Sequence, residues 1–131
     1  MSVSEPGFDN DENKPVAYPA DDSLSHCIDQ HPTPTEQASC VEEALGRWDE
    51  AMNAVYRNLI DRLASKSTLI EAQRGWLAFR DAEYPLIDSI YETLPSQEYR
   101  PLQAYSRLRL TRERALLLKK YLALASSEEA E

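Results

Sequence analysis

The clearest pattern in the chain is an apolar stripe with helical spacing between residues 33 and 64. Apolar side chains recur there every three or four residues, as they do along one face of an α-helix. The sequence Thr33-Pro34-Thr35-Glu36 precedes the stripe and is typical of a capping box with proline in the first turn. We therefore expect a long helix that ends at about Ala64. The stripe consists of Val41, Leu45, Trp48, Met52, Val55, Leu59 and Leu63.

A second helix is predicted after a short turn. Thr68-Leu69-Ile70-Glu71 is typical of another capping box, which places the turn at residues 65–67. Pro85 lies inside this helix and is expected to bend or break it, because proline lacks the N–H that a helix interior uses. Pro95 ends the segment. Its apolar positions are Leu69, Trp76, Leu77, Phe79, Ile87, Ile90, Tyr91 and Leu94.

A third helix is predicted from Ser96 or Pro101 through Leu124. It is apolar over a wide angle, as a helix packed against two others must be. A short turn between long helices makes them antiparallel. The pattern therefore predicts an all-α fold: an antiparallel helical hairpin plus a third helix, in a three-helix up-down-up bundle. The wide apolar face consists of Leu102, Tyr105, Leu108, Leu110, Leu116, Leu117, Leu118 and Leu122.

Composition sets the limits of the folded domain. A chain of 131 residues that is 42% apolar suits one domain with a modest core, and its three glycines favour helices. Residues 1–24 are acidic and proline-bearing, so we expect a disordered tail there. Residues 25–125 should form the helical domain, and residues 126–131 an acidic C-terminal tail. No apolar run approaches a membrane span or a signal-peptide core, which fits either a mature exported protein or a cytosolic one.

The net charge of −9 at pH 7 argues against a nucleic acid partner, because phosphate binding needs a basic surface. It suits a basic protein partner, whose approach the charge would accelerate. Residues 100–120 reverse the sign, with seven basic residues against Glu113 alone. Four of these are arginines within residues 107–114, and they do not share one helix face. We expect several to pair with acids on the first two predicted helices; contact with anionic lipid or glycan is the alternative.

The two cysteines, Cys27 and Cys40, have twelve residues between them. In an exported protein such a pair forms a disulfide, whereas in a cytosolic one it would be two free thiols. His26 and His31 lie beside them, so a metal site is the alternative. The spacings do not repeat in the tight pairs that zinc sites favour, so if the protein is exported we expect one disulfide with two exposed histidines beside it and no metal.

Polar residues also lie in the seam that the first two helices would form. Gln73 and Arg80 occupy core-facing positions of the second helix, and Asp49, Asn53 and Tyr56 lie beside the stripe of the first. Folding the hairpin about its turn places Asn53 opposite Arg80. In the structural interpretation, Asp49 and Asn53 hold a buried Arg80 and fix the register, so Arg80→Ala would destabilise the fold. In the functional one, the seam is an exposed polar cleft that grips a ligand.

These residues carry a resemblance to a known family. The segment Trp48–Tyr56 (WDEAMNAVY) and the segment Ala72–Glu83 (AQRGWLAFRDAE) resemble the LprI-type lysozyme-inhibitor family, over roughly residues 27–118. The second segment also contains Trp76 and Asp81, which join the polar set. The resemblance implies export to the periplasm or cell surface, a helical fold, no cofactor and, for some members, inhibition of lysozyme.

The chain departs from the family pattern at Tyr84. Members commonly have a cysteine there, after Arg-Asp-Ala-Glu, and a partner cysteine further along. This chain has no third or fourth cysteine. Without a second disulfide, we expect the region of residues 85–101 to be looser or rebuilt.

Catalysis is not expected, because no set of catalytic residues stands out. The pairs Glu42-Glu43 and Asp49-Glu50 are neighbours on a helix and point apart. No Ser-His-Asp set, Cys-His set or glycine-rich phosphate loop is present. We therefore expect a periplasmic or secreted binding protein that inhibits a basic, lysozyme-like cell-wall muramidase by occlusion. The alternative is a periplasmic immunity-type or structural envelope module whose partner is not lysozyme.

Overall fold

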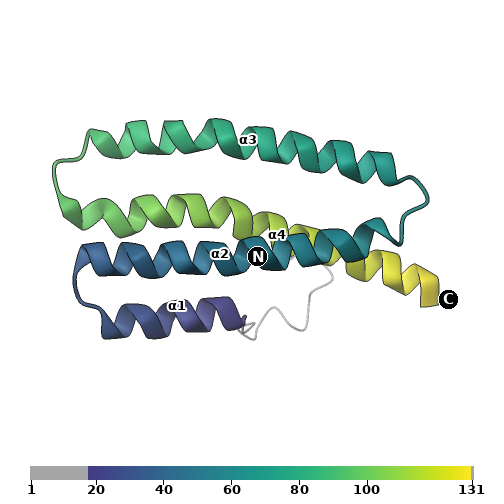
Figure 1. Ribbon diagram of the computed structural model, residues 1–131, viewed down its shortest axis with the longest axis horizontal. Helices are drawn as coiled ribbons and strands as arrows, with labels where there is room; N and C mark the ends of the chain where they lie inside the picture. Colours follow the sequence, from purple (N-terminus) through teal and green to yellow (C-terminus); the bar gives the residue numbers. More distant parts are fainter. Residues whose placement is uncertain (1–17, 131) are drawn as a thin grey trace, which may run out of the picture.

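The computed structural model of the protein describes residues 18–130, and every regular element in this range is helical (Figure 1). The all-α prediction is confirmed, but the predicted count of three helices is wrong, because a further helix precedes the expected ones. No helix in the described range is long and apolar enough to cross a membrane. The elements are α1 (Pro19–Gln30), α2 (Pro34–Ile60), α3 (Lys66–Glu92), a short 3₁₀ helix η2 (Gln97–Tyr99) and α4 (Arg100–Ala130).

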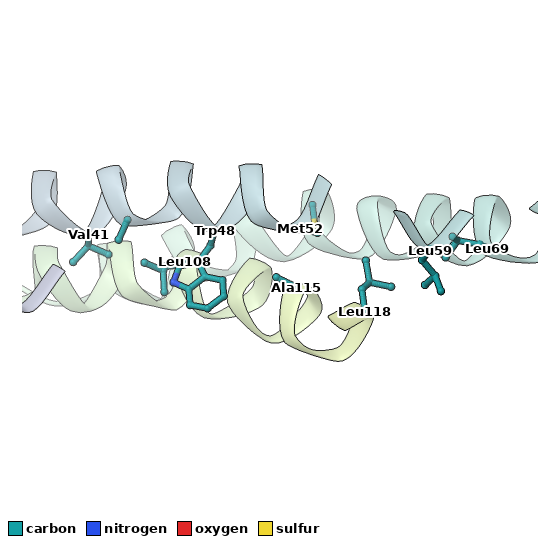
Figure 2. Close-up of a cluster of buried hydrophobic side chains, with 9 residues drawn as sticks. Val41, Trp48, Met52, Leu59, Leu69, Leu108, Ala115 and Leu118 are labelled. Atoms are coloured by element: carbon teal, nitrogen blue, oxygen red, sulfur yellow. The ribbon is translucent and has the colours of Figure 1, made fainter. Parts of the chain in front are cut away.

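The core lies between α2 and α4, which run in the same direction and pack closely against each other (Figure 1). The apolar stripe of α2 faces α4, so the stripe predicted from the sequence is the side of α2 that forms the core. Met52, Leu108 and Leu118 are almost completely buried. Figure 2 draws the cluster, whose buried members are Val41, Ala44, Trp48, Met52, Leu59, Leu69, Leu108, Ala115 and Leu118.

The starts of α2 and α3 differ in how well they were predicted. At α2 the capping box is confirmed: the Thr33 hydroxyl accepts from the Glu36 amide at 3.2 Å, and Glu36 Oε1 accepts from the Thr33 amide at 3.5 Å. Helix α3 begins at Lys66 with Ser65 as its N-cap, so the box predicted at Thr68 is wrong. The Thr68 hydroxyl lies 3.0 Å from the Ser65 hydroxyl, already inside the first turn.

Helix α1 lies partly within the segment predicted to be a tail, residues 1–24. Residues 1–17 lie outside the described range, but the helix begins at Pro19. Proline in the first turn, followed by Asp21 and Asp22, is a sequence signal for the start of a helix. The signal was missed because the segment as a whole is polar and acidic. No residue of α1 is fully buried, which is why the segment has no strong apolar stripe. At the other end α4 continues to Ala130, past the predicted domain end at residue 125.

Helix α3 is the least buried of the long helices. Only Leu69 and Gln73 are buried along its 27 residues, and Phe79, Leu86 and Ile90 are each at least half exposed. It packs weakly against α4 and hardly touches α2, so the predicted close packing of the α2–α3 hairpin is not found. The short turn does make the two helices antiparallel (Figure 1). The apolar stripe of α2, however, is already covered by α4.

Of the two expected effects of Pro85, a bend or a break, the break does not occur, since α3 continues to Glu92. A proline removes one backbone donor and leaves the carbonyl four residues earlier without its helical partner. That carbonyl belongs to Asp81, an exposed residue, so water can satisfy it.

Candidate binding groove

An open groove of about 430 Å³ separates α2 from α3, and its walls carry most of the polar residues singled out in the sequence. Asp49, Asn53 and Tyr56 line it from α2, and Gln73 and Arg80 line it from α3. The structure thus brings five of the seven polar residues together at one site. Trp76 and Asp81 do not line the groove. Its remaining lining residues are Met52, Ile70, Arg74 and Leu77.

Arg80 is held by its own helix. Its Nε and Nη2 donate to Asp81 Oδ1 at 3.1 and 2.9 Å. Its guanidinium lies 5.6 Å from the centre of the Trp76 ring and 5.8 Å from that of Tyr84. Trp76 and Asp81 therefore act from behind the groove wall, where they fix the direction of Arg80.

On the α2 side, Asn53 donates to Asp49 Oδ2 at 3.5 Å, one helical turn away. Among the described residues no hydrogen bond joins Asp49 or Asn53 to Arg80, so the predicted clamp across the hairpin does not form. The reason is the groove itself, since α2 and α3 meet at only a few points, such as Gln73 against Met52. Both polar side chains therefore keep hydrogen-bonding capacity that faces the groove.

Gln73 joins three helices at the floor of the groove. It is 7% exposed, and its Oε1 accepts from Arg114 Nε of α4 at 3.0 Å. Its Nε2 lies 3.7 Å from Met52 Sδ of α2, a weak acceptor. Desolvation by partial burial lowers the pKa of Arg114, and the charge interaction with Tyr121 opposes that shift in part.

Replacing Gln73 with leucine is expected to lower the free energy of unfolding by about 1–3 kcal/mol, because Arg114 Nε would lose its acceptor in a partly buried place. Urea denaturation followed by circular dichroism measures this. Gln73→Glu is the matched control, since it keeps an acceptor of the same length. Equal losses for both variants would contradict the role assigned to this hydrogen bond.

A second polar cluster, not predicted from the sequence, ties α1 to α2 and α4. Arg112 forms a two-pronged ion pair with Asp21, with Nη2 to Oδ2 at 2.7 Å and Nε to Oδ1 at 3.2 Å. The hydrogen bonds that Arg112 donates to the Asp21 carboxylate raise the pKa of Arg112. Trp48 Nε1 also donates to Asp21 at 3.3 Å, and the guanidinium lies over the rings of Tyr18 and Trp48. Asp21 could have been predicted as the partner of Arg112 only if α1 had been predicted as a helix.

The prediction that several arginines of α4 pair with acids on the two hairpin helices is only partly right, because among the described residues only Arg107 does so and Arg112 pairs with an acid of α1 instead. Besides Arg112, Arg107 pairs with Asp88 of α3 at 2.7 Å, and Arg109 pairs with Glu113 within α4 at 3.3 Å. The guanidinium of Arg107 also lies 4.3 Å from the centre of the Tyr84 ring. Tyr84, which stands where the family pattern has cysteine, thus ties α3 to α4 without a covalent bond.

The predicted disulfide between Cys27 and Cys40 is confirmed, and it joins α1 to α2. His26 is exposed as expected. His31 is half-buried, so the prediction of two exposed histidines is only partly right. The His31 ring is turned back onto the end of α1, where Nδ1 lies 2.8 Å from the carbonyl oxygen of Cys27.

The groove suits binding better than covalent chemistry. Its polar lining consists of a carboxylate, two amides, a phenol and two guanidiniums, and it has no serine, cysteine or histidine. Such a set can donate and accept hydrogen bonds and form ion pairs. It contains no nucleophile activated by a neighbouring base.

The part of the chain that forms the groove matches a known protein family. The model of the family described as lysozyme inhibitor LprI matches residues 27–118. The chain belongs to the LprI family. The matched range runs from the first cysteine of the disulfide into α4, so it contains both walls of the groove and Arg114, the partner of Gln73.

A crystal structure supports the fold of this LprI-family chain. An uncharacterized protein from Burkholderia thailandensis is similar to it with 30% sequence identity and a TM-score of 0.79. The alignment covers 85% of this chain and 56% of the other, so the LprI-family chain spans just over half the length of that protein. No curated protein matches the chain.

Proposed function

We propose that this protein is an exported, periplasmic or secreted inhibitor that binds a lysozyme-like cell-wall muramidase and blocks its substrate by occlusion. The observation that carries the proposal is the match to a lysozyme inhibitor family over the part of the chain that forms the groove. The net charge of −9 supports it, because muramidases of the lysozyme type are expected to be basic partners. The disulfide supports an oxidising compartment.

The groove between α2 and α3 is the contact surface in this proposal. Asp49 and Asn53 supply acceptors that no residue of another helix in the described range uses, and Arg80 is pre-oriented by Asp81 and Trp76. A side chain already fixed in direction loses less entropy on binding than a free one. Because α3 packs weakly on the rest of the bundle, the width of the groove can adjust to an inserted segment of the enzyme.

The test is a titration of the oxidised protein against lysozyme that is turning over a cell-wall substrate, at low and at physiological salt. Stoichiometric inhibition at physiological salt is the expected result, and higher salt should slow association. Absence of inhibition at both salt concentrations would refute the proposed function.

The contact surface is tested with two neighbouring carboxylates of α2. Asp49→Asn is expected to weaken inhibition by at least about tenfold, which corresponds to about 1.4 kcal/mol. Glu50→Gln removes the same charge from an exposed residue outside the groove, and it should have little effect. Equal effects of the two variants would mean that net charge, and not the groove, governs binding.

A partner other than lysozyme is the second candidate, as for an immunity-type or structural envelope module. The charge of the groove favours this second candidate, because its lining has one carboxylate, Asp49, and two guanidiniums, Arg74 and Arg80. A mixed lining does not select a strongly basic partner. This candidate predicts no binding to lysozyme and recovery of an envelope protein on immobilised wild-type protein, with reduced recovery on Asp49→Asn.

A further inference from the structure

The His31 ring lies beside both sulfurs of the disulfide, although a disulfide needs no histidine neighbour. His31 Nδ1 is 3.8 Å from Cys27 Sγ and 3.9 Å from Cys40 Sγ. One nitrogen and two sulfurs, from three residues and two helices, therefore lie within 4.8 Å of one another. His31 reaches this position because it follows the last turn of α1, where the chain turns back toward α2.

These separations match the ligand set of a zinc ion. Zinc binds thiolate sulfur at about 2.3 Å and imidazole nitrogen at about 2.0–2.1 Å in tetrahedral geometry, which places a sulfur and a nitrogen ligand about 3.5 Å apart. Both nitrogen–sulfur distances are already close to that value. Only the two sulfurs must separate, to about 3.8 Å, and a Cα–Cα distance of 5.8 Å leaves room for that change.

We propose that reduction of the Cys27–Cys40 disulfide converts this cluster into a site for Zn²⁺ or a similar thiophilic cation. In the oxidised protein the sulfurs are bonded to each other and supply no thiolate, so the site is closed to metal. In the reduced protein Cys27, Cys40 and His31 supply two thiolates and one imidazole. Water completes the coordination.

The reduction step requires a dithiol as co-reactant. One of its thiolates attacks a sulfur of the bridge and forms a mixed disulfide, and its second thiolate then releases the protein. The S–S bond of the protein breaks and one forms in the reductant, while two electrons and two protons pass to Cys27 and Cys40. Zinc binding then displaces both thiol protons.

His31 must also change its tautomer. Its Nδ1 now donates to the carbonyl oxygen of Cys27 at 2.8 Å, so this nitrogen carries the proton. Metal binding needs the lone pair of Nδ1, and the proton then lies on Nε2. The cost is one hydrogen bond at the end of α1.

A path for the ion exists. A solvent-open pocket of about 460 Å³ is lined by all three ligand residues. The carboxylates of Glu36 and Glu43 line the same pocket and give it the negative charge that attracts a cation. His26 does not belong to the cluster, although it is the residue next to Cys27.

The experiment is a titration of the reduced full-length protein with Co²⁺, which reports thiolate ligation by near-ultraviolet charge-transfer absorption and tetrahedral geometry by visible bands. The expected result is one Co²⁺ per chain, displaced by Zn²⁺, and no such spectrum for the oxidised protein. Absence of the charge-transfer band from the reduced protein would overturn the proposal. So would an equal signal from the oxidised protein.

Two histidine variants make the test specific. His31→Gln retains an amide that can donate to the Cys27 carbonyl, but it removes the ligand, and we expect at least about a 100-fold loss of affinity. His26→Ala is the matched control and should bind as the wild type does. Circular dichroism of each reduced variant establishes that the helices persist. Unchanged affinity in a helical His31→Gln would show that His31 is not a ligand.

Discussion

Replacing Trp48 with alanine is expected to lower the free energy of unfolding by about 3–5 kcal/mol, the largest effect of any single substitution considered for this protein. The side chain is 5% exposed and lies in the core between α2 and α4 (Figure 2). Its ring packs edge-on against Tyr18 with a centroid distance of 5.5 Å, and Arg112 lies 5.2 Å from its centre. Its Nε1 donates to Asp21, so the substitution also removes a tie to α1.

Chemical denaturation measures this loss, and the only other tryptophan is a natural control. Trp76 is half-buried at the edge of the core, so Trp76→Ala should cost clearly less. Trp48→Phe keeps most of the apolar volume but removes the donor to Asp21, and a loss of about 1 kcal/mol is expected. A loss for Trp76→Ala as large as that for Trp48→Ala would mean that the core is wrongly placed.

Removal of the disulfide is expected to cost about 3 kcal/mol, the value that chain entropy predicts for a loop of this size. The double variant Cys27→Ala/Cys40→Ala is the appropriate protein, because it leaves no thiol to react. The effect should be concentrated in α1, since that helix has no fully buried residue and is otherwise held by the Asp21–Arg112 pair and partial packing. Hydrogen exchange should therefore show early loss of protection in α1.

The wild-type protein treated with a dithiol in the presence of a metal chelator should reproduce that behaviour. The chelator matters, because a bound cation would restore the link between α1 and α2. If the α1 amides of the double variant stay as protected as those of α2, the bridge is not what holds α1 in place.

The parts of the fold that were predicted are those in which local sequence and tertiary packing agree. The part of the stripe from Val41 to Leu59 gives the core side of α2, and the Thr33–Glu36 box gives its start; Leu63 lies past the end of the helix. The disulfide followed from two cysteines and an assumed oxidising compartment. The sequence also predicted that Asp49, Asn53 and Gln73 lie close together, and all three line one groove. An antiparallel hairpin with a short turn determines which residues of its two helices lie opposite each other.

The parts of the fold that were not predicted depend on contacts between segments that are far apart in the sequence. Helix α1 buries no residue completely, so it leaves little apolar signal, and its acid Asp21 meets Arg112 from the far end of the chain. The width of the groove could not be read from the hairpin alone. It follows from α4, which covers the apolar face of α2. Helix α3 is then held by buried Leu69, by the hydrogen bond of Gln73 with Arg114, and by the contacts of Tyr84 and Asp88 with Arg107.

The pairing of α2 with α4 also determines when the protein can fold. The core residues of α2 lie between Val41 and Leu59, and their partners lie between Leu108 and Leu118, with the whole of α3 between them in the chain. Contacts of such high sequence separation slow folding compared with a bundle whose neighbours in space are neighbours in sequence. The chain therefore cannot close its core until α4 is present, and until then the apolar face of α2 stays exposed to water.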